Sequence, residues 1–344
     1  MPSSSFIRAA IFAAGAVVGG GIATVVRRRK EESVPTLVAP PAEKPSPNIE
    51  GPAVDVSAKG QLQLTTSTAI APPGQVVLKR PVSDLLVRKA YVAAYDRRLR
   101  HPAWTAEHLT LASLGKSALE PASPGSETGD RQKSAFAEDP GLPTLFRSRL
   151  QDYFRSGYDR GHMVPAADAK TSQDAMDETF LLSNIAPQVG DGFNRHYWAY
   201  VEDWCRRLTS SFSDVYVFTV PLYIPHKEAD GKWRVTYEMI GTPPNVAVPT
   251  HFAKVVLTSR PSSPSTPDVP EISTGAFVLP NAKIPDETPL ESFIVPVDAV
   301  ERAAGLTLFS DEIKQASKHI CQTSKCQVIV RRFDDARQRA IVKK

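Results

Sequence analysis

The sequence predicts an α+β domain, in which helices pack on a central antiparallel sheet. Two observations support this fold class. Short runs rich in Val, Ile, Phe, Tyr and Thr, which favour strands, recur between polar and Pro-rich stretches. Separate, longer runs repeat apolar residues at intervals of three and four, as an amphipathic helix does. Such a mixture, without an internal repeat, is typical of α+β proteins.

The expected strands and helices follow from these two patterns. Strands are expected at residues 90–95, 215–219, 235–240, 252–257, 276–279 and 293–296. Helices are expected at residues 172–177, 195–210 and 297–304. The last helix leads into Gly305, and glycine commonly ends helices.

The helix at residues 195–210 has one apolar face, because its apolar residues recur at helical spacing. These residues are Trp198, Val201, Cys205 and Leu208. Trp198 and Trp204 are therefore expected in the core, and Cys205 is expected to be buried. Cys321 and Cys326 lie near the C-terminus, and the sequence leaves open whether they form a disulfide or remain free thiols.

Composition separates a linker from a globular domain. Residues 31–75 are rich in Pro, Ala, Ser, Glu and Lys and lack apolar periodicity, so a disordered linker is expected. Residues 76–340 are expected to form one globular domain. Within it, residues 115–140 and 260–273 exceed ordinary loop length and are expected as surface loops, either disordered or specific to one branch of related proteins.

The N-terminal segment carries a targeting pattern. Residues 9–26 are nearly all apolar or small, with Arg8 before them, a basic run at residues 27–30 after them, and no acidic residue until Glu31. The apolar stretch is at the short end for a membrane span, which needs about 20 residues. A secretory signal places its positive charge before the apolar stretch. Residues 1–30 are therefore expected to be a mitochondrial address with an inner-membrane anchor, while a secretory signal or a simple anchor in the endoplasmic reticulum stays open.

The most informative motif is Asp-Arg-Gly-His at residues 159–162, which is followed in order by Asn184, Asn194, Glu202 and Arg206. These residue types supply what metal-assisted phosphodiester cleavage needs. A histidine near its ordinary pKa can take a proton from water at neutral pH. Mg²⁺ keeps several waters and often takes only one or two protein ligands, so one Asn carbonyl can anchor it. Arginine contacts phosphate oxygens in bidentate fashion.

In these residues the chain resembles the DNA/RNA non-specific endonucleases that carry the Asp-Arg-Gly-His motif, and most closely their mitochondrial endonuclease G branch. The resemblance runs from about residue 85 to residue 310. It implies the ββα-metal nuclease fold, with a central antiparallel sheet and helices packed on it. It also implies a homodimer and products with 5′-phosphate ends.

The resemblance assigns a role to each residue of the constellation. It implies that His162 is the general base and that Asn194 binds the metal. It implies that Arg160 contacts phosphate, that Glu202 holds the water shell of the metal, and that Arg206 stabilises the charge of the transition state. Each assignment is made on the matching position of this sequence.

A further site residue and two departures from the family pattern complete this assignment. Asn184 matches a polar residue that supports the catalytic group, without a defined role. The loop between Asn184 and Asn194 is one residue longer than in bacterial relatives, so Asp191 could be mistaken for the ligand. Val220 stands where glycine is expected, which would change the turn after its strand.

Structural readings of the same residues stay open at this point. His162 could be a hydrogen-bonded structural histidine, and Asn194 could serve only as a helix N-cap, a position that asparagine favours. Glu202 and Arg206 could form an ordinary surface pair at i,i+4, worth only about 0.3–0.5 kcal/mol.

Charge alone does not establish nucleic-acid binding. The net charge is +4, and part of the excess lies in the leader, so the globular part is close to neutral. The run from Arg97 to His101 and the pair at residues 331–332 could contact phosphates or could be solvated surface charges. No zinc-finger, RRM or helix-turn-helix pattern is present, which fits contact with phosphates independent of base sequence.

The sequence thus predicts a Mg²⁺-dependent endonuclease, with Mn²⁺ as an alternative metal, that cleaves DNA and RNA. It is expected at the mitochondrial inner membrane, held by residues 9–26 and facing the intermembrane space, with release to the nucleus as a further expectation. Two alternatives are a membrane-tethered nucleic-acid-binding protein without catalysis and a phosphatase-like esterase for small substrates.

Overall fold

The computed structural model describes residues 54–56, 62–64, 84–116 and 128–330. Its main element is an eight-stranded sheet in the order β15-β14-β13-β8-β5-β4-β3, with β16 beside β14. Every pairing is antiparallel except that of β14 with β16. The predicted α+β class is therefore confirmed. The strands are β3 (Asp84–Val87), β4 (Tyr91–Asp96), β5 (His101–Leu109), β8 (Asp214–Leu222), β13 (His251–Ser263), β14 (Thr266–Pro280), β15 (Ile294–Val295) and β16 (Lys318–His319).

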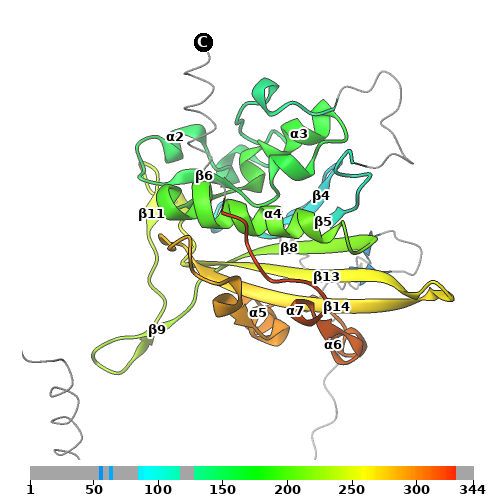
Figure 1. Ribbon diagram of the computed structural model, residues 1–344. Coiled ribbons are helices and arrows are strands. Elements are labelled where there is room, and N and C mark those ends of the chain that lie inside the picture. The colour runs from blue at the N-terminus through cyan, green and yellow to red at the C-terminus, as the bar shows by residue number, and fades with distance from the viewer. Residues whose placement is uncertain (1–53, 57–61, 65–83, 117–127, 331–344) are drawn as a thin grey trace, which may run out of the picture. The chain divides into compact units, whose positions relative to one another are not determined.

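Helices cover both faces of this sheet. Helix α4 (Trp198–Leu208) lies across one face, and α5 (Val297–Ala304) packs on the other (Figure 1). Two apolar clusters correspond to the two faces. One joins α4 to Val217, Phe252 and Val256 of the sheet. The other joins α5 to the residues that alternate with them, such as Phe218 and Val255.

The predicted helices agree closely with the structure. Helix α3 (Gln173–Thr179) begins after Ser172, whose hydroxyl accepts a hydrogen bond from the Ala175 amide at 3.1 Å. Helix α5 has the predicted bounds and ends at Gly305, which adopts a left-handed conformation with φ of 67°. The apolar side chains of α4 are buried as predicted, Trp198 and Trp204 at no more than 1% exposure and Cys205 among them.

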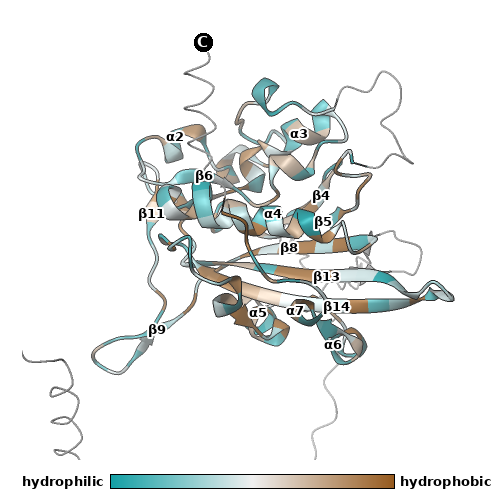
Figure 2. Cartoon of the chain, in the orientation of Figure 1, coloured by the Kyte–Doolittle hydropathy of each residue, from teal (hydrophilic) through white to brown (hydrophobic). Residues whose placement is uncertain are grey.

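Two sequence predictions about β-structure are wrong. Residues 260–273 are not a loop, because they extend the paired strands β13 and β14, with Arg260 opposite Glu271 and bonded to it at 2.8 Å. The far end of this ribbon is hydrophilic (Figure 2), so its polar composition was mistaken for a loop. Residues 235–240 form a strand only at β11 (Met239–Ile240), which pairs with β12 (Val246–Ala247). The preceding short hairpin is β9 (His226–Lys227) with β10 (Trp233–Arg234).

The C-terminal part of the described chain is fastened to α4. This part holds α6 (Asp311–Ala316) and α7 (Ile320–Thr323). Cys321, within α7, forms a disulfide with Cys326, which settles the alternative that the sequence left open. The Trp204 indole then donates to the Lys325 carbonyl at 2.9 Å, and Arg207 donates to the Gln327 carbonyl at 2.9 Å. A distant segment thus packs against the helix that carries Glu202 and Arg206.

The predicted leader (residues 1–30) and most of the linker (residues 31–75) lie outside the described residues, as do residues 117–127 of the long insertion and residues 331–340 of the predicted domain. Two short strands in the linker region, β1 (Val54–Val56) and β2 (Leu62–Leu64), pair with each other. Among the residues that the structure describes, no helix has the length and apolar character needed to span a membrane.

Candidate active site

The Asp-Arg-Gly-His motif forms a strand of its own. This strand, β6 (Asp159–His162), pairs antiparallel with β7 (Ile185–Gln188), with His162 opposite Ile185 and Asp159 opposite Gln188. Gly161 is required here, because a Cβ at this position would overlap the Gln188 side chain. The chain then passes through a turn into α4. Two strands and a helix therefore gather the motif and Asn194 in one place.

Asn184 fixes the backbone that follows His162. Its side-chain oxygen accepts from the Val164 amide at 3.0 Å, and its amide group donates to the carbonyls of Val164 at 3.0 Å and Thr179 at 2.9 Å. Its own carbonyl accepts from the Met163 amide at 2.8 Å. The side chain is fully buried. These contacts make Asn184, predicted as a catalytic candidate, a residue that positions His162 through the backbone.

His162 lies in an aromatic setting that keeps its ring neutral. The ring is only 8% exposed and lies between Phe136 and Phe180, with centroid distances of 5.3 and 4.8 Å. Burial, together with the charge of Arg131, lowers the pKa of His162 to about 3. Its Nε2 atom is buried and, among the described residues, has no hydrogen-bond partner. The alternative of a hydrogen-bonded structural histidine therefore finds no support at this nitrogen, and the ring is unprotonated at neutral pH.

Two arginines stack on the same aromatic rings. Arg160, from the motif, lies 4.4 Å above the Phe136 ring, and Arg131 lies 5.6 Å above the Phe180 ring. Both side chains are exposed, and cation–π contact holds each guanidinium beside the histidine without consuming its hydrogen-bond donors. Arg131 was not among the predicted site residues, because the length and polar composition of its segment are typical of a surface loop.

The described part of the 115–140 insertion lies largely at the surface, and it also contacts the candidate site. Phe136 packs against the His162 ring, and Asp139 is buried between Arg88 and Ser183, to both of which it is bonded. Length and polar composition predicted a surface loop, but this segment forms one side of the site. Only the alignment of many related sequences could have distinguished the two cases.

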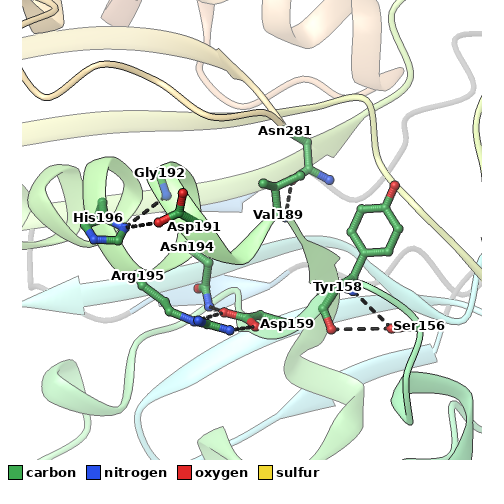
Figure 3. A network of polar contacts seen from close by, with 10 residues as sticks. All are labelled: Ser156, Tyr158, Asp159, Val189, Asp191, Gly192, Asn194, Arg195, His196 and Asn281. Atoms are coloured by element: carbon green, nitrogen blue, oxygen red, sulfur yellow. Dashed lines mark hydrogen bonds and ion pairs between the residues drawn. The ribbon is translucent and has the colours of Figure 1, made fainter. Parts of the chain in front are cut away.

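A carboxylate sets the orientation of Asn194. The Asn194 amide nitrogen donates to Asp159 Oδ2 at 2.9 Å, and Arg195 makes two bonds to the same carboxylate at 2.8 and 2.5 Å (Figure 3). Partial burial alone would raise the pKa of Asp159, but the bonds from Arg195 and Asn194 lower it below its ordinary value. Because the NH₂ group must face the carboxylate, the Asn194 oxygen is left to accept a metal. The role of Asp159 was missed, although it is the first residue of the motif.

The Asp191 carboxylate interacts with Lys283 and His196 and not with the motif strand. Its carboxylate lies 3.0 Å from the Lys283 ammonium and 3.9 Å from His196 Nδ1, and Lys283 holds the pKa of Asp191 below its usual value. His196 accepts a hydrogen bond from the Gly192 amide at 3.0 Å, so it stabilises the turn before the helix (Figure 3). Asn194, and not Asp191, is the residue that contacts the motif strand.

Glu202 and Arg206 lie further along α4, where buried charges meet. Arg206 donates to Asp168 at 2.8 Å and lies 4.0 Å from Asp203, so it does not form a simple surface pair with Glu202. Burial alone would lower the pKa of Arg206, but Asp168 and Glu202 raise it. Burial raises the pKa of Glu202 to about 7, against the opposing charges of Lys254 and Arg206. Arg206 is twelve residues beyond Asn194, about 18 Å along an ideal helix.

The predicted phosphate contacts outside this region find other partners. Arg97 makes two bonds of 2.6 Å to Asp84, and His101 is buried and lies 2.6 Å from the Tyr223 hydroxyl. Burial lowers the pKa of His101 to about 4. These two residues therefore serve the fold. The pair at residues 331–332 lies outside the described chain.

The residues present fit a lightly ligated, hydrated cation. Within the described ranges no group of three or more His, Cys, Asp or Glu side chains could hold a metal. The Asn194 oxygen is the available ligand, and Gln188, next to the motif strand, has a buried amide group without hydrogen-bond partners. One neutral oxygen ligand surrounded by unmatched polar groups suits Mg²⁺, which keeps most of its waters.

An antiparallel strand pair followed by a helix, with the histidine on the first strand and the asparagine at the helix start, defines the class of ββα-metal nucleases. Residues 72–315 match the family model described as DNA/RNA non-specific endonuclease. The chain belongs to this family, in its mitochondrial endonuclease G branch.

Individual relatives place the chain within this family. It is 50% identical over 253 residues, 74% of each chain, to Nuclease 1, mitochondrial, of Schizosaccharomyces pombe. It is 44% identical over 298 residues to the Mitochondrial nuclease of Saccharomyces cerevisiae, which covers 86% of this chain and 83% of that one. A crystal structure of the EndoG/EndoGI complex superposes with a TM-score of 0.61 at 44% identity, covering 68% of this chain and 89% of that chain.

Proposed function

We propose that this nuclease hydrolyses phosphodiester bonds of DNA and RNA in a Mg²⁺-dependent reaction, with Mn²⁺ as a substitute, and leaves 5′-phosphate ends. One observation carries the proposal. His162, neutral and with an unpartnered Nε2, lies on the same short strand as Asp159, which turns the Asn194 oxygen away from itself. One strand thus carries the proton acceptor, His162, and orients the metal ligand, Asn194.

The proposed reaction uses these residues in sequence. His162 Nε2 takes a proton from the attacking water while the new P–O bond forms, the bond to the 3′ oxygen breaks, and that oxygen takes a proton from a second water molecule to leave as a hydroxyl. Arg160 binds the phosphate oxygens, and Arg206, held by Asp168 further along α4, adds positive charge from a distance that favours the transition state. Asn194 would hold Mg²⁺, with Glu202 bonded to its water shell. When bound, the cation supplies charge neutralisation at the phosphoryl group and at the leaving oxygen.

Digestion of plasmid DNA and of total RNA, with Mg²⁺ and with EDTA, tests the proposal. We expect both substrates to be cut internally, only with the metal, and the new ends to be substrates for a ligase without prior phosphorylation. Retention of nucleic acid without cleavage would favour the non-catalytic binding protein. Hydrolysis of small phosphate esters alone would favour the phosphatase-like esterase.

We also propose a location at the mitochondrial inner membrane, facing the intermembrane space, with residues 9–26 as anchor and residues 31–75 as tether. The names of the relatives from both yeasts support the mitochondrion. Deletion of residues 1–75 should give an active enzyme that fractionates away from mitochondria and can reach the nucleus. A truncated protein that stays mitochondrial, or that is unfolded, would contradict this assignment.

A homodimer completes the proposal. Apolar side chains on the arm between β10 and β11 support it, because Trp233, Val235 and Met239 are 68%, 46% and 40% exposed. A second copy of the chain would cover them. Light scattering of the purified protein should give twice the chain mass, and Trp233→Ser should lower it. A wild-type protein that is monomeric at micromolar concentration would exclude the dimer.

A further inference from the structure

A buried polar group interrupts the apolar face of the sheet under α4. Thr105, Thr219 and Lys254 stand directly opposite one another on the neighbouring strands β5, β8 and β13. Glu107 lies two residues further along β5, on the same face. All four side chains are at most 5% exposed. Alternation along a strand makes this the face that α4 covers, so these polar groups lie inside the core and beneath the candidate site.

Lys254 is the centre of this group. Its ammonium donates to the Thr219 hydroxyl at 2.6 Å and to the Met163 carbonyl at 3.5 Å, and it lies 5.2 Å from the centroid of the Trp198 ring. Met163 directly follows His162, and Trp198 begins α4. One side chain thus contacts the sheet, the segment behind the catalytic histidine and the catalytic helix. Lysine is almost never fully buried without a partner, because its desolvation is costly.

The opposite charges near Lys254 are carboxylates. Burial, followed by the nearby Asp168, raises the pKa of Glu107 well above its usual value, and Lys254 opposes this shift. Lys254 opposes the rise in the pKa of Glu202 as well, together with Arg206. The charged groups that act on this space are Glu107 from β5, Asp168 from the turn after β6, Glu202 and Arg206 from α4, Arg131 from the segment before Phe136, and Lys254 itself from β13.

We propose that Lys254 is a positioning residue of the nuclease reaction: its buried ammonium, set against the Trp198 ring one helical turn before Glu202, is the counter-charge against which Glu202 is held on α4, and it ties the backbone behind His162 to the central sheet. The proposal rests on the role of Glu202 proposed above. It explains why the sheet keeps a buried cation where a leucine or methionine would pack at lower cost. Lys254 acts through Glu202 and through the Met163 carbonyl and does not itself contact the substrate.

Lys254→Met in the full-length chain tests the charge, because methionine has similar length and no charge. Removing an opposite charge at short range shifts a carboxyl by about one pH unit or more. We expect the acidic limb of the pH–rate profile to move to higher pH by about one pH unit. The rate at pH 7 should fall by about fivefold and recover toward the wild-type rate at pH 9. The Mg²⁺ concentration for half-maximal rate should rise at pH 7. Lys318→Met, which removes an exposed lysine bonded to Glu271 far from α4, is the matched control and should leave the profile in place.

A double-mutant cycle separates this role from a purely structural one. In a Glu202→Gln background, Lys254→Met should not move the pH profile further, because the group on which Lys254 acts is gone. A lowered melting temperature with an unchanged profile would overturn the proposal, as would a shift of equal size in both backgrounds. If Lys254→Met does not fold, Thr219→Val removes an anchor of the ammonium and should shift the limb upward by a smaller amount. No shift with that variant would also overturn it. Failure of the wild-type protein to cleave DNA would instead contradict the proposed function.

Discussion

The two faces of the central sheet are built from neighbouring residues of the same strands, yet they differ in chemistry. On the α5 face, Phe218 and Val255 belong to a cluster of buried apolar side chains. On the α4 face, one residue along, Thr219 and Lys254 are polar and equally buried. One face stabilises the fold by burying apolar area, which contributes roughly 25 cal/mol per Å². The other gives up part of that stabilisation to hold ionised groups beneath the site.

The comparison separates stability from catalysis within one sheet. A substitution on the α5 face should change the free energy of unfolding and leave the chemistry alone. A substitution of a polar residue on or beneath the α4 face should change the rate, its metal requirement or its pH dependence, whereas the apolar cluster on that face also stabilises the fold. Each variant below tests whether this division holds, beginning with the largest expected effect on rate.

His162→Ala should lower the cleavage rate by about 10²–10⁴-fold, the usual cost of losing a general base. Nucleic-acid affinity should change little, because Arg160 and the metal supply the phosphate contacts. Single-turnover cleavage and a gel-shift titration in the presence of Ca²⁺ measure the two quantities. His101→Ala, at another buried histidine, is the control and should keep the specific rate of the folded protein. A His162→Ala enzyme with more than about a third of the wild-type rate would contradict the assignment.

Asn194→Ala should raise the Mg²⁺ concentration needed for half-maximal rate by more than about tenfold, and Asp159→Ala should do so by about 10- to 100-fold, because Asp159 orients the ligand. Asp191→Ala should have little effect, since its carboxylate is bonded to Lys283. Metal titrations of the three variants compare them directly. A larger effect from Asp191→Ala than from Asn194→Ala would mean that the ligand is misassigned.

The pH dependence should follow Glu202 and not His162. Burial lowers the pKa of His162 to about 3, so the base stays neutral throughout the working range. Burial raises the pKa of Glu202 to about 7, so its charged form is lost as the pH falls through 7. At sub-saturating Mg²⁺, the rate should therefore drop by about tenfold for each unit below pH 7. Glu202→Gln should be slow and should lack this limb. A limb that persists in Glu202→Gln would assign it to another group.

Phe218→Ala on the α5 face should destabilise the fold by about 3–5 kcal/mol, the range for truncating a buried Phe. Phe218 is 2% exposed and contacts the Phe309 ring at a centroid distance of 5.7 Å. Denaturant unfolding measures the loss, and the cleavage rate per folded molecule should stay within about twofold of wild type. A rate loss beyond that, at a temperature where the variant is folded, would show that the two faces are coupled.

Local patterns in the sequence were sufficient for much of this structure. Helix α3 was predicted from its residue pattern, and α5 from its residue pattern and a terminal glycine; these signals act within a few residues. The resemblance to the endonuclease family picked out the motif at residues 159–162 and Asn194, and the structure brings Asp159 and Asn194 into contact although they are 35 residues apart. Residues 260–273 and 235–240 were mispredicted, because a long polar ribbon resembles a loop and an apolar exposed arm resembles a strand.

The supporting groups could not be predicted, because they depend on pairing between distant segments. Lys254 is 91 residues from the Met163 carbonyl that it contacts, and Asp139 is 44 residues from Ser183. Nothing in the sequence around Lys254 distinguishes it from a lysine at a strand surface. Asp159 is part of the motif, but the sequence did not show that its carboxylate accepts a hydrogen bond from Asn194 and so orients that side chain.

Trp204 and Arg207 of α4 bond to the carbonyls of Lys325 and Gln327, which are synthesised much later than the helix. The Trp204 indole and the Lys325 carbonyl that it contacts are 121 residues apart. The ribosome therefore releases the segment that packs against the catalytic helix long after the helix itself. During that interval α4 lacks two of its bonds and the disulfide-closed loop beside them. We expect the growing chain to be a poor nuclease, so that RNA near the ribosome is spared until translation is almost finished.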